Sequence, residues 1–396
     1  MDISLLFSKQ FAALLPPIVC VTMLLSSLFA SFRNKLDVKC TLVAFWIATT
    51  VLYACHAMYF NDMMEKYPLS SVLYVFCNLL VFPLFLYYLC VIAQEKKYSL
   101  LWFVLPALLG GAATLACYFA CGDRYGEFIQ RYLYEQEYVT SDNVLFATCL
   151  VHDFCRLLFA VEVISVVYFG VRVISTFNKR LDDFYSNTEE KSMNKITVLL
   201  KCMLAISLFS FVINILGRQF FENAPEWLGI PALLFSVALV FLGTVCLQQQ
   251  FTIHDLLLVE QRNEYALEML EDTEGSLSYP MKKYKSSKDL WEKINRTILD
   301  NRLFTDSNFN VSDLSTRIFV NRTYVQLVIK EYSGMTFHEY VNTIRMAYAE
   351  ELKEKNPKRL IKEIIQDAGF ASPSAYYRAL KKNEESQPEP VDEEEA

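Results

Sequence analysis

Four acidic or basic side chains interrupt the apolar stretch 144–171: His152, Asp153, Arg156 and Glu162. Ionisable residues in such a stretch are costly, so their presence suggests a function. Asp153 and Arg156 lie three residues apart, and His152 and Arg156 lie four apart, so all three can share one helix face. Two interpretations remain open: a ligand pocket, or an internal ion pair that holds helices together.

A second chemistry-bearing stretch, "NRTYVQLVIKEYSGMTF", runs from Asn321 to Phe337. Asn321 can cap a helix, and Ser333-Gly334 can end it. The expected inward face carries Val325, Val328 and Ile329, and the outward face carries Arg322, Thr323, Gln326 and Lys330. With the preceding "NVSDLSTRIFV" this predicts a helix-turn-helix, whose second helix enters the major groove of DNA.

The same arrangement recurs about 50 residues later in "LIKEIIQDAGFASPSAYYRALKK". Gly369 stands where a left-handed turn residue is needed, Ser372 can cap the next helix, and Pro373 suits the first helical position. The outward candidates are Ser374, Tyr377, Arg378 and Lys381. A helix over about 337–355 joins the two units, so the sequence predicts two helix-turn-helix units on a rigid connection.

Residues 289–382 resemble the DNA-binding domain of the AraC/XylS family of transcription regulators, through "NRTYVQLVIKEYSGMTFHEYVNTIRMAYAEEL" and "IKEIIQDAGFASPSAYYRALKK". The resemblance implies two recognition helices that read successive major-groove segments on one face of DNA. It assigns base contacts to Thr323, Gln326 and Leu327 in the first helix, and to Ser374, Tyr377 and Arg378 in the second. Arg345 and Ala349 match the linker helix, where Arg345 is expected to have a structural role.

Several residues depart from the family pattern. Phe319 stands in the first turn, where Gly, Asn or His is commoner because positive φ is unfavourable for Phe. Ile365 and Leu380 replace a small Ala and a Phe, and "NEESQPEPVDEEEA" replaces the family's closing segment. These differences predict a second unit that is looser, or one that serves mainly for phosphate contact.

Charge favours DNA as the partner of the C-terminal part. Residues 282–382 contain 19 Lys/Arg and 12 Asp/Glu, a net charge of +7, whereas residues 383–396 contain seven acids and no bases. Phosphate contacts require the first composition. The acidic tail is expected to be a disordered, solvating end, although it could also mimic DNA on the basic face.

The first 250 residues are typical of a membrane protein. Overall, 54% of the residues are apolar, and the excess lies in the N-terminal part together with all eleven Cys. Seven stretches are long enough to cross about 30 Å of hydrocarbon. They are Phe11–Phe32, Cys40–Phe60, Leu69–Ala93, Ser99–Cys121, Val144–Val171, Ile196–Leu216 and Trp227–Leu247.

The distribution of Lys and Arg predicts the orientation of these spans. With the N-terminus outside, inner loops carry ten Lys/Arg and outer segments carry five, including those of the longest outer loop, 122–143. The excess of basic residues marks the cytoplasmic side. Seven crossings then place the C-terminal domain in the cytosol, where DNA is accessible. His152, Asp153 and Arg156 fall near the outer surface, Glu162 lies deeper, and Asn78 could line the same bundle.

Other chemistries are not expected. The Cys residues are scattered singly and show no zinc spacing, so neither a metal nor a cofactor is predicted. The last span contains no Lys, which excludes a retinal pump with its Schiff base. The bundle also lacks HExxH and GxSxG patterns, so the chain is not expected to be an enzyme.

The segment 251–288 is interpreted as a signalling helix and linker. Leu256, Val259, Asn263, Ala266 and Leu270 step by three and four residues, which fits either a dimerising coiled-coil seam over 251–272 or a surface helix. Basic residues 282–288 could also contact anionic membrane lipid.

The sequence therefore predicts an all-α chain with four parts. These are a seven-helix membrane bundle (1–250), the signalling segment (251–288), the AraC-like double helix-turn-helix domain (289–382) and the acidic tail (383–396). The leading hypothesis is a one-component transcription regulator in a bacterial inner membrane, which binds double-stranded DNA and senses an external or membrane signal such as a small molecule. The alternatives are a transporter or membrane enzyme with a regulatory tail, and a membrane adaptor that binds protein.

Overall fold

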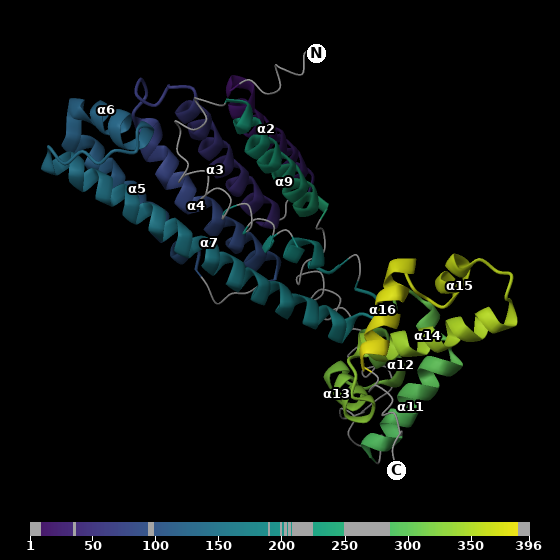
Figure 1. The fold of residues 1–396 in the computed structure, drawn as a ribbon. Helices are drawn as coiled ribbons and strands as arrows, with labels where there is room; N and C mark the ends of the chain where they lie inside the picture. The colour runs from purple at the N-terminus through teal and green to yellow at the C-terminus, as the bar shows by residue number, and fades with distance from the viewer. Residues whose placement is uncertain are drawn as a thin grey trace, which may run out of the picture. The chain divides into compact units, whose positions relative to one another are not determined.

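The computed structural model describes residues 9–34, 37–93, 99–188, 191–198, 225–248 and 286–386, together with positions 200, 201, 204 and 207. Within these residues the secondary structure is helical, apart from one isolated bridge between Tyr185 and Asn310 (Figure 1). The predicted all-α class is therefore confirmed. The segment 251–285 and the tail beyond 386 lie outside the described residues, so the predicted dimer seam stays a prediction.

The chain divides into two compact units that are not contiguous in sequence. We call residues 1–175 with 193–251 the N-terminal unit, and residues 176–192 with 252–396 the C-terminal unit. This division differs from the contiguous one that the sequence suggested, because 176–192 packs with the C-terminal helices.

Six helices in the described residues are long and apolar enough to cross a membrane, and they match six of the seven predicted spans. The remaining one, predicted over Ile196–Leu216, lies largely outside the described residues. The helices of the N-terminal unit are α2 (Lys9–Asn34), α3 (Asp37–Phe60), α4 (Leu69–Ile92), α5 (Leu100–Cys121), α7 (Asn143–Phe184, which continues into the C-terminal unit) and α9 (Gly229–Gln248), the last preceded by the short η3 (Pro225–Leu228).

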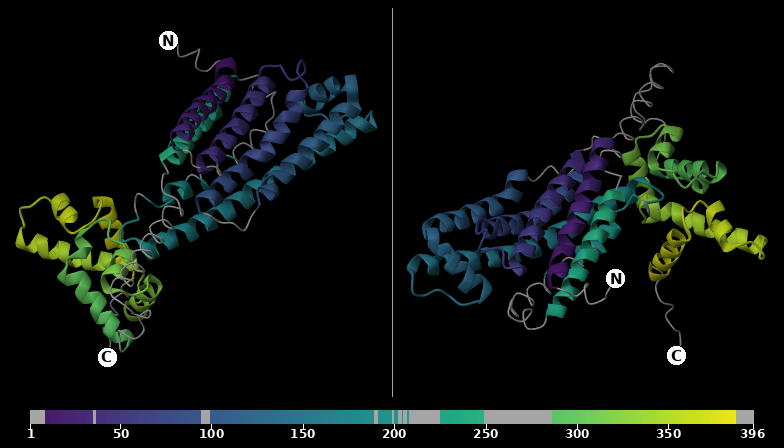
Figure 2. Two further views of the ribbon diagram at one scale, coloured as in Figure 1. Left: turned by 180° about the vertical axis from the view of Figure 1, so that it is seen from behind. Right: turned by 90° about the horizontal axis from the view of Figure 1, so that it is seen from above.

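Neighbouring helices of the N-terminal unit pack in order, α2 on α3, α3 on α4 and α4 on α5, while α9 returns beside α2 (Figures 1 and 2). Helices α4 and α5 approach closely at Gly110 and Gly111. A Cβ at Gly110 would come within 2.4 Å of Leu79 Cδ1, and one at Gly111 within 2.9 Å of Phe76 Cδ2. Small residues allow such approaches between apolar helices, where packing supplies the attraction.

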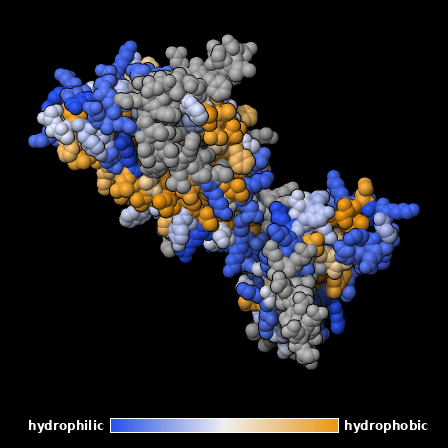
Figure 3. Space-filling view, viewed as in Figure 1, coloured by the Kyte–Doolittle hydropathy of each residue, from blue (hydrophilic) through white to orange (hydrophobic). Residues whose placement is uncertain are grey.

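Apolar residues (orange) gather over part of the face of this unit that Figure 3 shows. Phe119 is 72% exposed, and Phe154, Leu157 and Ile164 on α7 are 63–64% exposed. A contiguous apolar surface of this kind is unusual for a protein surrounded by water. It is the surface expected of helices whose outer faces contact lipid.

The loop expected over 122–143 is partly helical. Residues 122–134 form η1 (Gly122–Arg124), α6 (Tyr125–Phe128) and the π-helix η2 (Ile129–Tyr134). Tyr125, Phe128, Ile129 and Tyr132 are buried together in one apolar cluster, because they recur at helical spacing. The apparent loop is therefore a folded cap, and only the stretch after Tyr134 is irregular.

In its described residues the C-terminal unit contains α-helices over both predicted helix-turn-helix units, over the helix that joins them, and over a segment before them. They are α11 (Ser287–Asp300), α12 (Val311–Ile318), α13 (Arg322–Ser333), α14 (Phe337–Lys355), α15 (Ile361–Asp367) and α16 (Pro373–Ser386), with the short η4 (Leu303–Thr305) after α11. Each of α11, α12, α13 and α14 contributes fully buried apolar side chains, including Ile294, Leu314, Ile329 and Val341. Helix α16 extends to Ser386, past the predicted boundary at 382, so the described part of the acidic tail is helical.

The turn between α12 and α13 contains a strained residue. Phe319 has φ 55° and ψ 48°, the left-handed region, and its side chain is 41% exposed. This conformation costs about 1–2 kcal/mol for an L-residue with a side chain. The sequence correctly predicted an unfavourable Phe at this position.

Replacing Phe319 by Gly is therefore expected to stabilise the C-terminal unit by about 0.5–1 kcal/mol, since Gly adopts positive φ freely but gains freedom in the unfolded chain. The urea midpoint of the full-length protein, followed through hydrogen exchange of α12 and α13, measures this change. Phe319→Ala, which keeps the strain, is the matched control and should not stabilise. Equal midpoints for the Gly and Ala variants would show that strain is not the cause.

Candidate nucleic-acid interface and membrane cavity

The first predicted recognition helix, α13, is anchored along one face. Val325, Val328 and Ile329 have no exposed surface. The Asn321 side chain accepts a hydrogen bond from the Thr323 backbone N–H at 2.8 Å, and Gly334 ends the helix with φ 71°. The cap and the stop predicted from the sequence are both present. They hold the opposite face of α13 in a fixed register.

The outward residues of α13 differ from the expectation in one respect. Thr323, Leu327 and Lys330 are exposed, as predicted, whereas Arg322 and Gln326 are partly covered. The cause is the end of α7. Gln326 Nε2 donates a hydrogen bond to the Asp183 carbonyl oxygen at 2.5 Å, and the Arg322 guanidinium lies 5.9 Å from the centre of the Phe184 ring.

The residues after α7 continue along the C-terminal unit. Ser186 donates from both its backbone N–H and its hydroxyl to the Phe309 carbonyl oxygen, and Tyr185 forms the isolated bridge with Asn310. Phe184, Tyr185 and Ser186 are all buried. This segment is thus an integral part of the C-terminal unit, although more than 120 residues separate it from Phe309.

Arg345 on the linker helix α14 is fully buried and makes five hydrogen bonds. Its Nε donates to the Phe304 carbonyl at 2.6 Å, and one terminal nitrogen donates to the Asn342 side-chain oxygen at 3.3 Å and the Ser186 carbonyl at 2.9 Å. The other donates to the Ser186 hydroxyl at 2.9 Å and the Asp306 carbonyl at 2.8 Å. Burial lowers the pKa of Arg345 to about 10, so it stays charged at neutral pH. Its predicted structural role agrees with this geometry.

His338, one turn before Asn342 on α14, binds the same segment. Its Nδ1 lies 2.9 Å from the Ser186 carbonyl oxygen, and its Nε2 lies 3.0 Å from the Asn342 amide nitrogen. The geometry fits a neutral ring that donates from Nδ1 and accepts at Nε2. Burial lowers the pKa of His338, which favours this neutral form.

The second helix-turn-helix has a complete small core. Ile364, Ile365, Phe370 and Tyr376 are buried together with Met346 and Ala349 of α14. Ile365, which replaces the usual Ala, has no exposed surface, so the unit accommodates it. The predicted outward residues Ser374, Tyr377, Arg378 and Lys381 are exposed. Gly369 has φ 91°, and a Cβ there would lie 2.3 Å from the Phe304 carbonyl oxygen.

One ion pair joins the linker helix to the second recognition helix. Lys382 Nζ lies 2.6 Å from Glu339 Oε1, while Glu339 Oε2 accepts from the Thr336 backbone N–H at 2.8 Å. Burial alone would raise the pKa of Glu339, but Lys382 and the Thr336 groups together lower it to about 2. The carboxylate therefore stabilises the fold in its ionised form.

Because the folded-state pKa of Glu339 lies below its ordinary value of 4.5, its stabilisation is complete above pH 4.5 and is lost as the pH falls towards 2. Acid titration of the hydrogen-exchange stability of α14 and α16 should show this loss. Glu339→Gln should flatten the acid slope, whereas Glu331→Gln, an exposed neighbour on α13, should leave it unchanged. An unaltered slope in the Glu339 variant would contradict the assignment.

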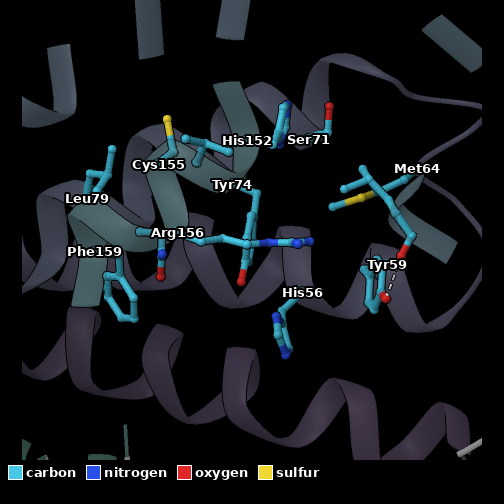
Figure 4. A pocket seen from close by; sticks show the side chains of 13 residues that line it. His56, Tyr59, Met64, Ser71, Tyr74, Leu79, His152, Cys155, Arg156 and Phe159 are labelled. Atoms are coloured by element: carbon cyan, nitrogen blue, oxygen red, sulfur yellow. Dashed lines mark hydrogen bonds between the residues drawn. The ribbon is translucent and has the colours of Figure 1, made fainter. Parts of the chain in front are cut away.

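In the N-terminal unit, three of the predicted ligand residues meet at one cavity of about 310 Å³. His152 and Arg156 from α7 and Asn78 from α4 line it, with the aromatic rings of His56 and Tyr74 stacked 5.8 Å apart. Figure 4 shows Arg156, Tyr74 and His56 around this cavity. His152 is 4% exposed, and its Nε2 has no hydrogen-bond partner among the residues that the structure describes.

The other two predicted ligand residues lie elsewhere. Asp153 lies 3.3 Å from Arg156, as the spacing indicated, but it faces Tyr132 and Tyr138, whose hydroxyls donate to it. Glu162 is buried away from the cavity, and neither of its oxygens has a partner within the described part of the chain. His152 packs against Phe128 at 4.8 Å rather than against Asp153.

Phe184 and Ser186, which contact the first recognition helix and Arg345, were not identified from the sequence. A signal was present, since Ile174, Phe177, Leu181 and Phe184 step by three and four residues, and all four are buried. This amphipathic spacing continues past the apolar span, with no Gly or Pro to end the helix. It indicates that α7 leaves the span and packs on a second unit.

The chain was compared with known proteins. Residues 314–392 match the model of a helix-turn-helix domain family. A curated relative, the Msm operon regulatory protein of Streptococcus mutans serotype c, is 29% identical over 75 residues. This alignment covers 19% of the present chain and 27% of the relative. No solved structure matches. The C-terminal part of the chain is an AraC-type helix-turn-helix domain.

Proposed function

We propose that this AraC-type domain belongs to a membrane-embedded one-component transcription regulator. In this proposal the helical bundle senses an external or membrane signal, and the C-terminal unit binds DNA sequence-specifically. The matched domain family and the operon regulator among the relatives support the DNA-binding role. The remainder of the proposal rests on the described geometry of α7.

Helix α7 is the observation that carries the proposal. Its 42 residues are continuous from Asn143 to Phe184, and at about 1.5 Å per residue they extend about 63 Å, twice the hydrocarbon thickness of a bilayer. One end carries His152 and Arg156 at the cavity, and the other carries Asp183 and Phe184 beside α13. One continuous helix thus contains residues that line the candidate sensing site and residues that contact the candidate DNA-reading helix.

The cavity favours a small ligand with an anionic group and a flat apolar body. Its volume of about 310 Å³ accommodates about ten groups the size of a water molecule. Both hydrogen bonds of Arg156 within the described residues use Nη1, which leaves Nε and Nη2 for a carboxylate. His56, Tyr74 and Phe159 supply aromatic walls.

We assign the DNA contacts to the faces of α13 and α16 that lie away from the buried core. Gln326 and Arg378 are suited to adenine and guanine edges, and Thr323, Leu327, Ser374 and Tyr377 lie beside them in sequence. Lys330 and Lys381 supply positive charge for phosphate contacts, and we assign Arg322, one turn before Gln326, to base reading together with it. We place the protein in a bacterial inner membrane with this unit in the cytosol, and we propose that it is not an enzyme.

The experiment that tests the function is a map of the chromosomal sites bound by the full-length protein in its membrane. The proposal expects a small number of discrete sites with a shared motif, next to genes whose expression changes when the protein is removed. Enrichment equal to that in cells without the protein would overturn it. A DNA-independent pulldown of one abundant protein would favour the adaptor alternative.

A further inference from the structure

The end of α7 lies on the face of α13 that is assigned to base reading. Asp183 accepts the hydrogen bond of Gln326 through its carbonyl oxygen, and the Phe184 ring lies 5.9 Å from the Arg322 guanidinium. A Gln side chain bound in this way cannot present its amide to adenine, which needs both the amide nitrogen and oxygen. Two of the predicted DNA contacts are therefore already engaged within the chain.

Charge also opposes DNA at this position. The last turn of α7 contains Asp182 and Asp183. Burial raises the pKa of Asp183, and Lys330, on the same face of α13 as Arg322 and Gln326, is among the basic residues that lower it. DNA phosphates carry the same sign as these carboxylates. A duplex in contact with Lys330 would therefore be opposed by the charge of the Asp183 carboxylate, because phosphate binding depends strongly on local charge.

The segment beyond α7 is held independently of α13. Ser186 is bound by Phe309, His338 and Arg345, and Thr188 Oγ1 donates to the Asp182 carboxylate at 3.1 Å. These contacts leave Gln326 and Arg322 untouched. They tether the end of α7 beside α13. The effective concentration of this end at α13 therefore stays high even when it has separated from α13.

We propose that the last turn of α7, Leu181–Phe184, is an internal competitor of DNA for the first recognition helix, tethered at Ser186. In the docked state this turn covers Gln326 and Arg322, and DNA binds when the turn leaves α13. This inference rests on the proposed DNA-binding function, but it does not depend on which signal the bundle senses. Movement of α7 along its own axis would change the occupancy of the recognition face directly.

The test uses the full-length protein in lipid nanodiscs and a randomised duplex library at low salt. Phe184→Ala removes the ring over Arg322, and Asp183→Asn removes the competing charge without changing the size of the side chain. Both variants are expected to tighten DNA binding, by roughly tenfold for Phe184→Ala, which lies within the usual range of coupling between sites. Asp183→Asn is expected to give a smaller gain.

Two control variants test whether any loss of an acid, or any loss of buried packing, tightens DNA binding. Asp367→Asn removes an acid that pairs with Arg359 at 2.7 Å in the second helix-turn-helix, so it matches the charge change away from α13. Ile364→Ala removes buried apolar volume from the same unit and matches the loss of packing. Neither variant is expected to tighten DNA binding by more than a small factor. Equal gains for Asp183→Asn and Asp367→Asn would overturn the proposal.

A second measurement does not depend on the folding of any variant. Hydrogen exchange of the amides of residues 181–185 is compared with and without DNA in the wild-type protein. The proposal expects faster exchange on DNA, because the turn is displaced. If the protein binds DNA but the amides of residues 181–185 exchange at the same rate or more slowly, the proposed role of the last turn of α7 is overturned, whereas the proposed DNA-binding function stands. If neither the wild type nor the two α7 variants retains any duplex, the proposed function fails, and the competitor with it.

Discussion

Arg345→Ala is expected to unfold the C-terminal unit. The change removes all five hydrogen bonds of a side chain with no exposed surface. The buried Phe304 carbonyl oxygen loses the Arg345 donor, and the Asp306 and Ser186 carbonyl oxygens each lose one of their donors. Loss of one member of a buried charged network costs on the order of 3–5 kcal/mol, a large part of the stability of a small domain. Removal of the guanidinium also opens a cavity between three chain segments.

Urea unfolding of the full-length protein in nanodiscs, followed by hydrogen exchange of α11 and α14, measures this loss. Arg345→Lys is the informative companion, because a single ammonium keeps the charge but cannot reproduce the planar fork. Arg345→Lys should lower the free energy of unfolding of the C-terminal unit measurably, but by less than Arg345→Ala. Arg296→Ala, a change at an exposed residue on α11, serves as the control and should have little effect. A midpoint of Arg345→Ala within error of the wild type would refute the structural role.

The second large effect is expected at the DNA-reading face. Arg322→Ala combined with Gln326→Ala should weaken binding to selected sites by roughly 100-fold or more, since each good base contact supplies about 1–3 kcal/mol of discrimination. Binding to random duplex should change less, because phosphate contacts from Lys330 and the second unit remain. The double variant also removes the partners of Asp183 and Phe184, so its loss of specificity is not due to tighter docking of α7.

Competition binding with specific and random duplexes at two salt concentrations separates the contribution of base contacts from that of phosphate contacts. Lys330→Ala is the comparison: it should weaken both duplexes similarly and lower the dependence on salt. A double variant that loses specific and random binding in equal proportion would show that these two residues do not read bases. Intact binding of the double variant to a protein partner would instead favour the adaptor alternative.

The elements of both units could be predicted well because each depends on local signals. Six apolar spans and the helices of the C-terminal unit were located correctly, since apolar runs, caps such as Asn321 and stops such as Gly334 act over a few residues. The resemblance to the AraC/XylS family led to the further prediction that Arg345 has a structural role. Spacing alone brought Asp153 and Arg156 together correctly on one helix face.

The candidate site was less predictable because its key contacts join distant parts of the chain. Gln326 meets Asp183 across 143 residues, and Arg345 meets Ser186 across 159. The amphipathic spacing before Ser186 indicates that α7 packs on a second unit, but no local pattern identifies Arg345 as the partner of Ser186. For the same reason Asp153 and Glu162 were grouped with the cavity, whereas Tyr132 and Tyr138, from a stretch interpreted as a loop, bind Asp153.

The discontinuous C-terminal unit also constrains how the protein is made. Ser186 leaves the ribosome 159 residues before Arg345. At about 5–20 residues per second this is a delay of roughly 8 to 30 s. During this interval two further predicted spans, Ile196–Leu216 and Trp227–Leu247, are synthesised. The C-terminal unit can therefore be completed only after the last predicted span has been made. In the proposed membrane regulator, this order couples the assembly of the DNA-binding fold to membrane insertion.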